Sequence, residues 1–176
     1  THIPEKTNIS VEKKWQDNNN QDGLRANEVI IQLLADDVAV NGKTITLNAS
    51  NNWKASFENL PKKSNGKEVK YTVKEVITLN GYDSKITGNM TDGYIITNTH
   101  SPNVIEIPVE KVWNDSNDLD KIRPVEIKVK LLANGSVVEG KNIILNEENE
   151  WKASFTNLPE KNNGSKIEYT VEEENV

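Results

Sequence analysis

Residues 9–15 read ISVEKKW, a segment in which apolar and polar residues nearly alternate. Successive side chains of a β-strand point to opposite faces of the sheet. One face then carries the odd-numbered residues Ile9, Val11, Lys13 and Trp15. An apolar strand face packs inward when the sheet covers a core. The segment therefore predicts a half-buried strand, and it places the lysine on the inward face.

The same segment occurs a second time in the chain. VEKKWQD at 11–17 recurs as VEKVWND at 109–115, and NWKASFENLP at 52–61 recurs as EWKASFTNLP at 150–159, in both cases 98 residues later. A constant offset over several separated blocks is the signature of a tandem repeat. The chain is therefore expected to hold two copies of one structural unit.

The repeat also sets the expected domain boundaries. Residues 7–100 form a complete copy, and residues 105–176 form a second copy that lacks its C-terminal strand. Residues 1–6 are expected to be the linker from a preceding copy. Residues 101–104, which include a Ser-Pro-Asn run, are expected to be the linker between the two copies.

Each copy is expected to be all-β. The apolar runs are short and rich in β-branched residues, Asn-Gly, Asp-Gly and Leu-Pro pairs separate them, and no segment has a helical period. Several short strands in fewer than about 100 residues are typical of a β-sandwich. We expect strands in the first copy at 8–15, 28–35, 43–47, 53–58, 68–76, 83–87 and 93–98.

Composition limits the classes of function. The 176 residues include 21 basic and 27 acidic side chains, which give a net charge of −6, and no cysteine. The acidic balance argues against nucleic acid or an anionic membrane as partner. The missing cysteines exclude disulfides and thiolate metal sites. No phosphate-binding glycine loop or nucleophile–histidine arrangement occurs, so we expect no metal, no cofactor and no enzyme turnover.

Two further polar residues fall on inward strand faces. In KYTVKE, residues 70–75, the face with the apolar side chains also carries Glu75. In GYIITN, residues 93–98, it also carries Asn98. Together with Lys13, these residues would bring an amine, a carboxyl group and a carboxamide to the inner side of the unit.

Three arrangements of these groups are open. Lys13 and Glu75 could form a buried ion pair with Asn98 as a hydrogen-bond partner, or Lys13 could extend its ammonium group to solvent. The third arrangement is reactive. Burial disfavours the charged forms of amines and carboxyl groups, and a neutral amine is a nucleophile. Attack on the Asn98 carboxamide, assisted by the acid, would release ammonia and leave an isopeptide bond.

These residues, taken with their surroundings, resemble a known family. VEKKW and VEKVW, the loop WQDNNNQDGLR, the NWKASF and EWKASF blocks, YTVKE and YIITNT are similar, in this order, to the B-type repeats of collagen-adhesin surface proteins (CnaB domains). The resemblance implies a β-sandwich of inverse immunoglobulin (prealbumin-like) topology. It also implies a spontaneous isopeptide bond between the first and last strands, with Lys13 as the amine, Asn98 as the amide and Glu75 as the promoting acid.

The second copy departs from the family pattern. Lys111 and Glu173 match the amine and the acid, but the matching asparagine would lie beyond Val176. Within this sequence Lys111 is therefore expected to have no amide to attack. It would line an open groove beside an unpaired strand edge, which could accept a strand donor from elsewhere.

The resemblance implies a structural role. The repeats would be stalk or spacer modules of an extracellular, cell-wall-anchored adhesin from a Gram-positive bacterium. Their partners would be neighbouring repeats, with host extracellular matrix bound through other domains. Two alternatives stay open: a module that itself binds host matrix or a glycan, and a split acceptor that captures an asparagine-bearing strand.

Other conspicuous residues have simpler interpretations. The loop at 16–23 is rich in Asp and Asn, which are ordinary turn formers, so we do not assign it to calcium. Arg25 and Arg123 are expected to pair with carboxylates of their own loops. The tryptophans repeat in register, which favours packing against the core over a carbohydrate platform; they are Trp15, Trp53, Trp113 and Trp151.

Overall fold

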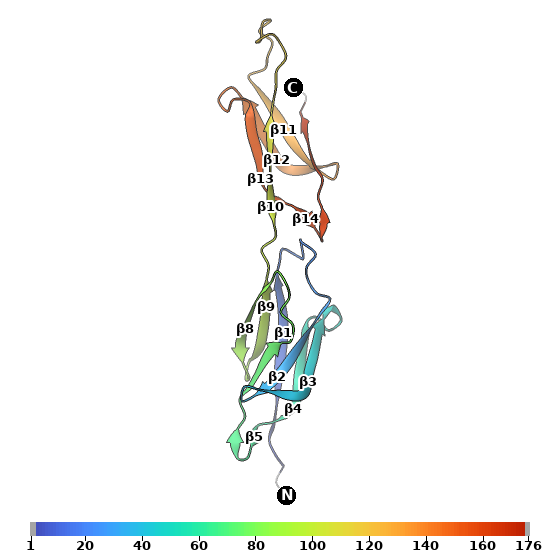
Figure 1. Cartoon of the computed structure of the whole chain (residues 1–176), viewed down its shortest axis with the longest axis vertical. Helices are drawn as coiled ribbons and strands as arrows, with labels where there is room; N and C mark the ends of the chain where they lie inside the picture. The colour runs from blue at the N-terminus through green and yellow to red at the C-terminus, as the bar shows by residue number, and fades with distance from the viewer. Residues whose placement is uncertain (1–2, 175–176) are drawn as a thin grey trace. The chain divides into compact units, whose positions relative to one another are not determined.

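The computed structural model describes residues 3–174; the ends of the expected segments 1–6 and 105–176 lie outside that range (Figure 1). The chain divides into two compact units. Unit 1 contains Leu24–Ser101 and the chain up to Asn20, and unit 2 contains Gln21–Gly23 and the chain from Pro102. Among the described residues, no helix has the length and apolar character needed to cross a membrane.

Unit 1 is a β-sandwich of two main sheets. The first sheet has the order β4-β1-β9-β8 and the second β3-β2-β7, while β5 and β6 form a small separate hairpin (Figure 1). The strands are β1 (Lys6–Gln16), β2 (Glu28–Ala35), β3 (Val38–Asn48), β4 (Lys54–Pro61), β5 (Lys63–Ser64), β6 (Lys67–Glu68), β7 (Tyr71–Glu75), β8 (Asp83–Asn89) and β9 (Gly93–Thr99). A single turn of 3-10 helix, η1 (Ala49–Asn51), joins β3 to β4.

Strand β1 organises the first sheet because it pairs on both edges. It runs antiparallel to β4 and parallel to β9, so the first and last strands of the unit lie side by side. In the parallel register Lys13 stands opposite Ile96, and Trp15 stands opposite Asn98. A parallel pair needs a long crossover, and here the rest of the unit supplies it.

The core of unit 1 lies between the two sheets. Alternate residues of the strands point into it, which accounts for the period of two in the sequence. Each fully buried aliphatic side chain contributes about 1.5–3 kcal/mol relative to exposure. The buried apolar residues of this core are Ile9, Val11, Val29, Ile31, Leu33, Leu47, Phe57, Leu60, Val69, Tyr71, Val73 and Ile96.

Two strands differ from the sequence expectation. The strand expected at 43–47 begins at Val38, because the Asn-Gly pair at 41–42 lies inside β3, where the β2–β3 register shifts, and does not end it. The strand expected at 68–76 is divided, since β6 ends at Glu68 and β7 begins at Tyr71. The turn between β2 and β3 uses Asp36 and Asp37, both with positive φ, as a two-residue hairpin requires.

Unit 2 repeats the strands of unit 1 from β1 to β7 as far as the chain is described. Its sheets have the orders β12-β11-β16 and β10-β13, with a small β14-β15 hairpin. The core consists of Ile127, Val129, Leu131, Leu145, Phe155 and Leu158. The strands are β10 (Val104–Glu110), β11 (Glu126–Ala133), β12 (Ser136–Asn146), β13 (Lys152–Pro159), β14 (Lys161–Asn162), β15 (Ser165–Lys166) and β16 (Tyr169–Glu173).

Candidate functional site

Lys13 and Glu75 meet across the sandwich of unit 1. Lys13 lies on β1 in one sheet, and Glu75 is the last residue of β7 in the other. The Nζ atom of Lys13 donates a hydrogen bond to Oε2 of Glu75 at 2.8 Å. The two side chains are 0% and 6% exposed. The lysine therefore does not extend its ammonium group to solvent, in contrast to the second arrangement considered from the sequence.

Asn98, on β9, contacts the same carboxylate. Its Nδ2 atom donates to Oε1 of Glu75 at 3.1 Å, and the residue is 1% exposed. Its Oδ1 atom is buried and accepts no hydrogen bond from the described part of the chain. Buried carbonyl oxygens are nearly always paired, so this oxygen is an exception. Glu75 thus holds the amine with one oxygen and the carboxamide with the other.

Two tryptophans pack beside Lys13. The Nζ atom of Lys13 lies 4.8 Å from the ring centroid of Trp15, within the range of a cation–π contact. Trp53 packs edge-on against Trp15, with 5.3 Å between ring centroids. The backbone N–H of Lys13 also donates to the Trp53 carbonyl at 2.8 Å. The site is therefore a small polar group inside an apolar wall.

This enclosure acts on the protonation of Lys13. Burial lowers the pKa of its amine below the ordinary value, against the opposing effects of the hydrogen bond and the charge of Glu75. A lowered pKa increases the fraction of neutral amine, which is the nucleophilic form. The arrangement can therefore support attack by Lys13 on the adjacent carboxamide.

Unit 2 has the amine and the acid at the same distance, but both side chains are more exposed to solvent. The Nζ atom of Lys111 donates to Oε2 of Glu173 at 2.8 Å, and the side chains are 25% and 44% exposed. Lys111 follows β10, which ends at Glu110 and pairs with β13. In the described part of unit 2, no strand occupies the other edge of β10.

The four tryptophans pack against the two cores, as the sequence pattern predicted. Trp113 and Trp151 repeat the edge-on contact in unit 2, with 5.1 Å between ring centroids. The Nζ atom of Lys111 lies 4.5 Å from the ring of Trp113. The aromatic wall is thus a property of the repeat.

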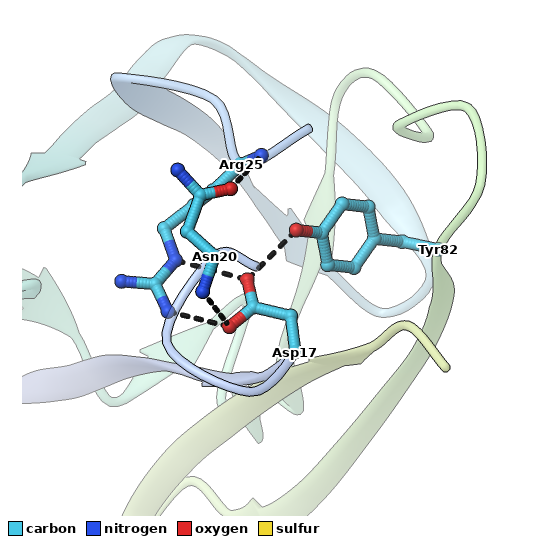
Figure 2. Close-up of polar contacts among 4 residues, drawn as sticks. All are labelled: Asp17, Asn20, Arg25 and Tyr82. Carbon is cyan, nitrogen blue, oxygen red and sulfur yellow. Dashed lines mark hydrogen bonds and ion pairs between the residues drawn. The ribbon is translucent and has the colours of Figure 1, made fainter. Parts of the chain in front are cut away.

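A second polar cluster lies in the loop after β1. The carboxylate of Asp17 stands between the guanidinium of Arg25 and the hydroxyl of Tyr82 (Figure 2). Arg25 donates from Nε to Oδ2 at 3.0 Å and from Nη2 to Oδ1 at 2.5 Å, and Tyr82 donates to Oδ2 at 2.7 Å. The backbone N–H of Asn20 completes the set at 3.0 Å.

This cluster confirms part of the sequence expectation and adds to it. Arg25 pairs with the loop carboxylate Asp17, and Arg123 pairs in the same way with Asp115, at 3.0 and 2.7 Å. Tyr82 was missed, because it lies 65 residues from Asp17 in an irregular segment with no periodic pattern. Burial alone would raise the pKa of Asp17, but the hydrogen bonds from Arg25, Tyr82 and Asn20 lower it to about 2.

The chain and its fold are similar to known proteins. The Cna protein B-type domain matches residues 9–99 and 107–176. The collagen adhesin of Staphylococcus aureus is 42% identical over 175 residues, which cover 99% of this chain and 14% of that protein. The crystal structure of two B repeat units (B1B2) of the S. aureus collagen-binding protein Cna has a TM-score of 0.90 and 42% identity, and it covers 99% of this chain and 46% of that one.

Proposed function

Because the chain belongs to the Cna protein B-type domain family, we propose that its two units are stalk repeats of an extracellular, cell-wall-anchored adhesin and that unit 1 is closed by an isopeptide bond between Lys13 and Asn98. Membership of the family makes the units repeats of a surface adhesin of immunoglobulin-like fold. The bond, the anchoring and the stalk role are the proposed part.

The contact of Glu75 with both reacting groups carries this proposal. A buried ion pair with Asn98 as a hydrogen-bond partner would show the same contacts, so the proposal also rests on the family to which the chain belongs. Here the second oxygen of Glu75 also binds the carboxamide of Asn98, at 3.1 Å. A single carboxyl group that touches both the nucleophile and the electrophile is placed to move protons between them.

The reaction balances without a cofactor. Glu75 takes a proton from the ammonium group of Lys13, and the neutral Nζ attacks the Cγ atom of Asn98. Oδ1 carries the negative charge of the tetrahedral intermediate, while Nδ2 stays against the protonated Glu75. The bond from Cγ to Nδ2 breaks, Nδ2 leaves as ammonia with a proton from Glu75, and the surplus proton of the attacking nitrogen restores the acid. Each lysine reacts once, so the process is maturation without turnover.

The bond would join neighbouring strands of the sheet. Because β1 and β9 are already paired, the cross-link forms without large movement of the backbone. It also closes a loop of the chain from residue 13 to residue 98, which restricts the unfolded state. In the chain-entropy model a closure of this length contributes about 4–5 kcal/mol. In a chain with no cysteine, such a bond would take the place of a disulfide.

Intact mass tests the bond directly. We expect the folded chain to be lighter than its sequence mass by one ammonia, with fragment ions that join the peptides containing Lys13 and Asn98. Lys13→Arg and Glu75→Gln should each have a mass equal to the sequence mass. Lys111→Arg is the matched control, and it should keep the deficit. A folded wild-type chain of undiminished mass would contradict the proposal.

We propose a related reaction for unit 2, since one edge of β10 is unoccupied in the described structure and Lys111 and Glu173 stand beside it. An asparagine on a strand that pairs with this edge, from whichever chain, would complete the same set of groups. This reading supports unit 2 as a strand acceptor. No comparable observation favours direct binding of matrix or glycan by these units.

A further inference from the structure

Arg25 links the loop cluster of unit 1 to the aromatic wall of the candidate site. Its guanidinium binds Asp17 through two hydrogen bonds and also lies over the ring of Trp15, with 5.5 Å from Cζ to the centroid. Tyr82 does the same from another element, since its hydroxyl binds Asp17 and its ring packs edge-on against Trp15 at 5.3 Å. Two members of the cluster thus hold one indole ring.

The same indole ring faces the reacting lysine. The Nζ atom of Lys13 lies 4.8 Å from the centroid of Trp15, and Asn98 is the strand partner of Trp15 in the parallel register. Trp15 therefore stands between the loop cluster and the amine. The ring thus contacts both the loop cluster and the amine of Lys13, whose side chain is 0% exposed.

We propose that Asp17, Arg25 and Tyr82 act as positioning residues that hold Trp15 against Lys13, exclude water from its Nζ atom and so set the rate of attack on Asn98. The inference rests on the proposed isopeptide bond. It adds four residues, Trp15 and the three that hold it, to the three that the reaction itself uses. None of the four touches the reacting atoms as donor or acceptor. They act through the enclosure of the amine.

The electrostatics of the cluster suit this role. Asp17 is 3% exposed and its pKa is about 2, so it stays ionised at neutral pH and keeps Arg25 in place. The charged groups placed against the amine are Glu75 by direct contact and Arg25 through the shared ring. Asp17 balances the charge of Arg25. What the cluster mainly controls is therefore the access of water, and water favours the unreactive ammonium form.

Unit 2 repeats the Asp–Arg part of the cluster and supplies a matched control. Arg123 binds Asp115 through two hydrogen bonds and lies 5.2 Å from the centroid of Trp113, which in turn faces Lys111. A substitution at Arg123 thus removes an equivalent clamp in the same molecule. It leaves the surroundings of Lys13 unchanged.

The test measures the rate of bond formation against pH. The full chain is assembled by chemical ligation in denaturant, its undiminished mass is confirmed, and folding is started by dilution at a series of pH values. Samples are quenched with acid, and the loss of one ammonia is followed by intact mass. Arg25→Gln should react about tenfold more slowly below the midpoint of the profile, with the profile displaced by about one pH unit to the alkaline side, because one unit of pKa changes the neutral amine about tenfold.

Three further variants keep the test decisive. The double variant Asp17→Asn/Arg25→Gln leaves no unpaired buried charge. It replaces Arg25→Gln if circular dichroism shows that the single variant does not fold. Its pH profile should be displaced by the same amount. Tyr82→Phe keeps the ring and loses the hydroxyl, and it should show a smaller displacement. Arg123→Gln should match the wild type.

The possible outcomes separate this inference from the proposed function. A folded Arg25→Gln or double variant with the wild-type rate and profile overturns the positioning role. A slower reaction with an unchanged pH profile also overturns it, because that result indicates general loosening of the fold. If the wild-type chain itself loses no ammonia, it is the isopeptide proposal that fails.

Discussion

The Nζ atom of Lys13 lies 2.8 Å from Oε2 of Glu75, with the two side chains 0% and 6% exposed. Lys111 and Glu173 stand at the same distance in unit 2, yet they are 25% and 44% exposed. The contact is therefore a property of the repeat, and the fuller enclosure in unit 1 accompanies two features described only there, the strand β9, which pairs with β1 and carries Asn98, and the contact of Tyr82 with Trp15. Enclosure, more than distance, separates a reactive pair from an ordinary ion pair.

The open edge of β10 should accept a strand. A peptide with the sequence GYIITNT, residues 93–99, is expected to pair with β10 and place its asparagine beside Lys111. Strand pairing would bury the amine and allow the reaction. Intact mass of the mixture should show an adduct that equals chain plus peptide less one ammonia.

Two controls define that result. Lys111→Arg should abolish the adduct, because the guanidinium stays charged. A peptide with Asn replaced by Gln should bind without a covalent product, since the longer side chain displaces the amide carbon. Absence of any adduct with the original peptide at millimolar concentration would rule out unit 2 as an acceptor of this strand.

Asp17 should make unit 1 sensitive to acid. Its pKa is about 2 in the fold and 3.8 in its ordinary state, so its contribution to stability is complete above about pH 5 and is lost as the pH falls through 3.8 toward 2. The difference corresponds to about 2 kcal/mol. The measurement is the free energy of unfolding of unit 1 in urea, at pH values from about 6 down to about 2. Hydrogen exchange of unit 1 peptides distinguishes the unfolding of unit 1 from that of unit 2.

The comparison is with Asp17→Asn, which cannot titrate. This variant should be less stable than the wild type at neutral pH, and the difference in their free energies of unfolding should shrink as the pH falls. Asp115→Asn is the matched control in unit 2. Hydrogen bonds from Arg123 also lower the pKa of Asp115, but its side chain is 28% exposed, so we expect a smaller gap. A gap that stays constant with pH would show that Asp17 acts by shape alone.

Gly88 should tolerate no side chain. It lies on β8 with φ of +93°, and a Cβ atom there would stand 2.1 Å from the backbone oxygen of Gly93. Gly88→Ala must therefore displace β8 from β9, at a cost of about 1–3 kcal/mol beyond that of the positive φ. Gly42→Ala is the control, since Gly42 also has positive φ, +70°, but has open space around it. Equal losses of stability in the two variants, measured by urea unfolding, would contradict this reading of the hairpin.

The period of two in the strands explains how far sequence reasoning reaches. It placed Lys13 and Asn98 on inward faces, and both are buried. The short β-branched runs and their turn signals predicted the β-sandwich, and the repeated loop predicted that Arg25 pairs with a loop carboxylate, which is Asp17. The isopeptide bond remains a prediction, because no contact in a structure of separate side chains tests a covalent product.

Other features depend on contacts that no local pattern encodes. Tyr82 reaches Asp17 from an irregular segment, so the contact depends on the path of that segment. The extent of β3 depends on a bulge at Gly42, where an Asn-Gly pair continues the strand in spite of its usual role as a turn. The contact of both Lys13 and Arg25 with one indole ring likewise needs the folded loop.

The parallel pairing of β1 and β9 has a mechanical consequence. Tension applied at the start of β1 and the end of β9 pulls the two strands in opposite directions along their shared length. The paired positions from Val11–Tyr94 to Gln16–Thr99 then resist in shear, all together, whereas a hairpin pulled from its open end would lose its pairs one at a time. The topology of unit 1 is therefore suited to bearing load even before any covalent bond forms.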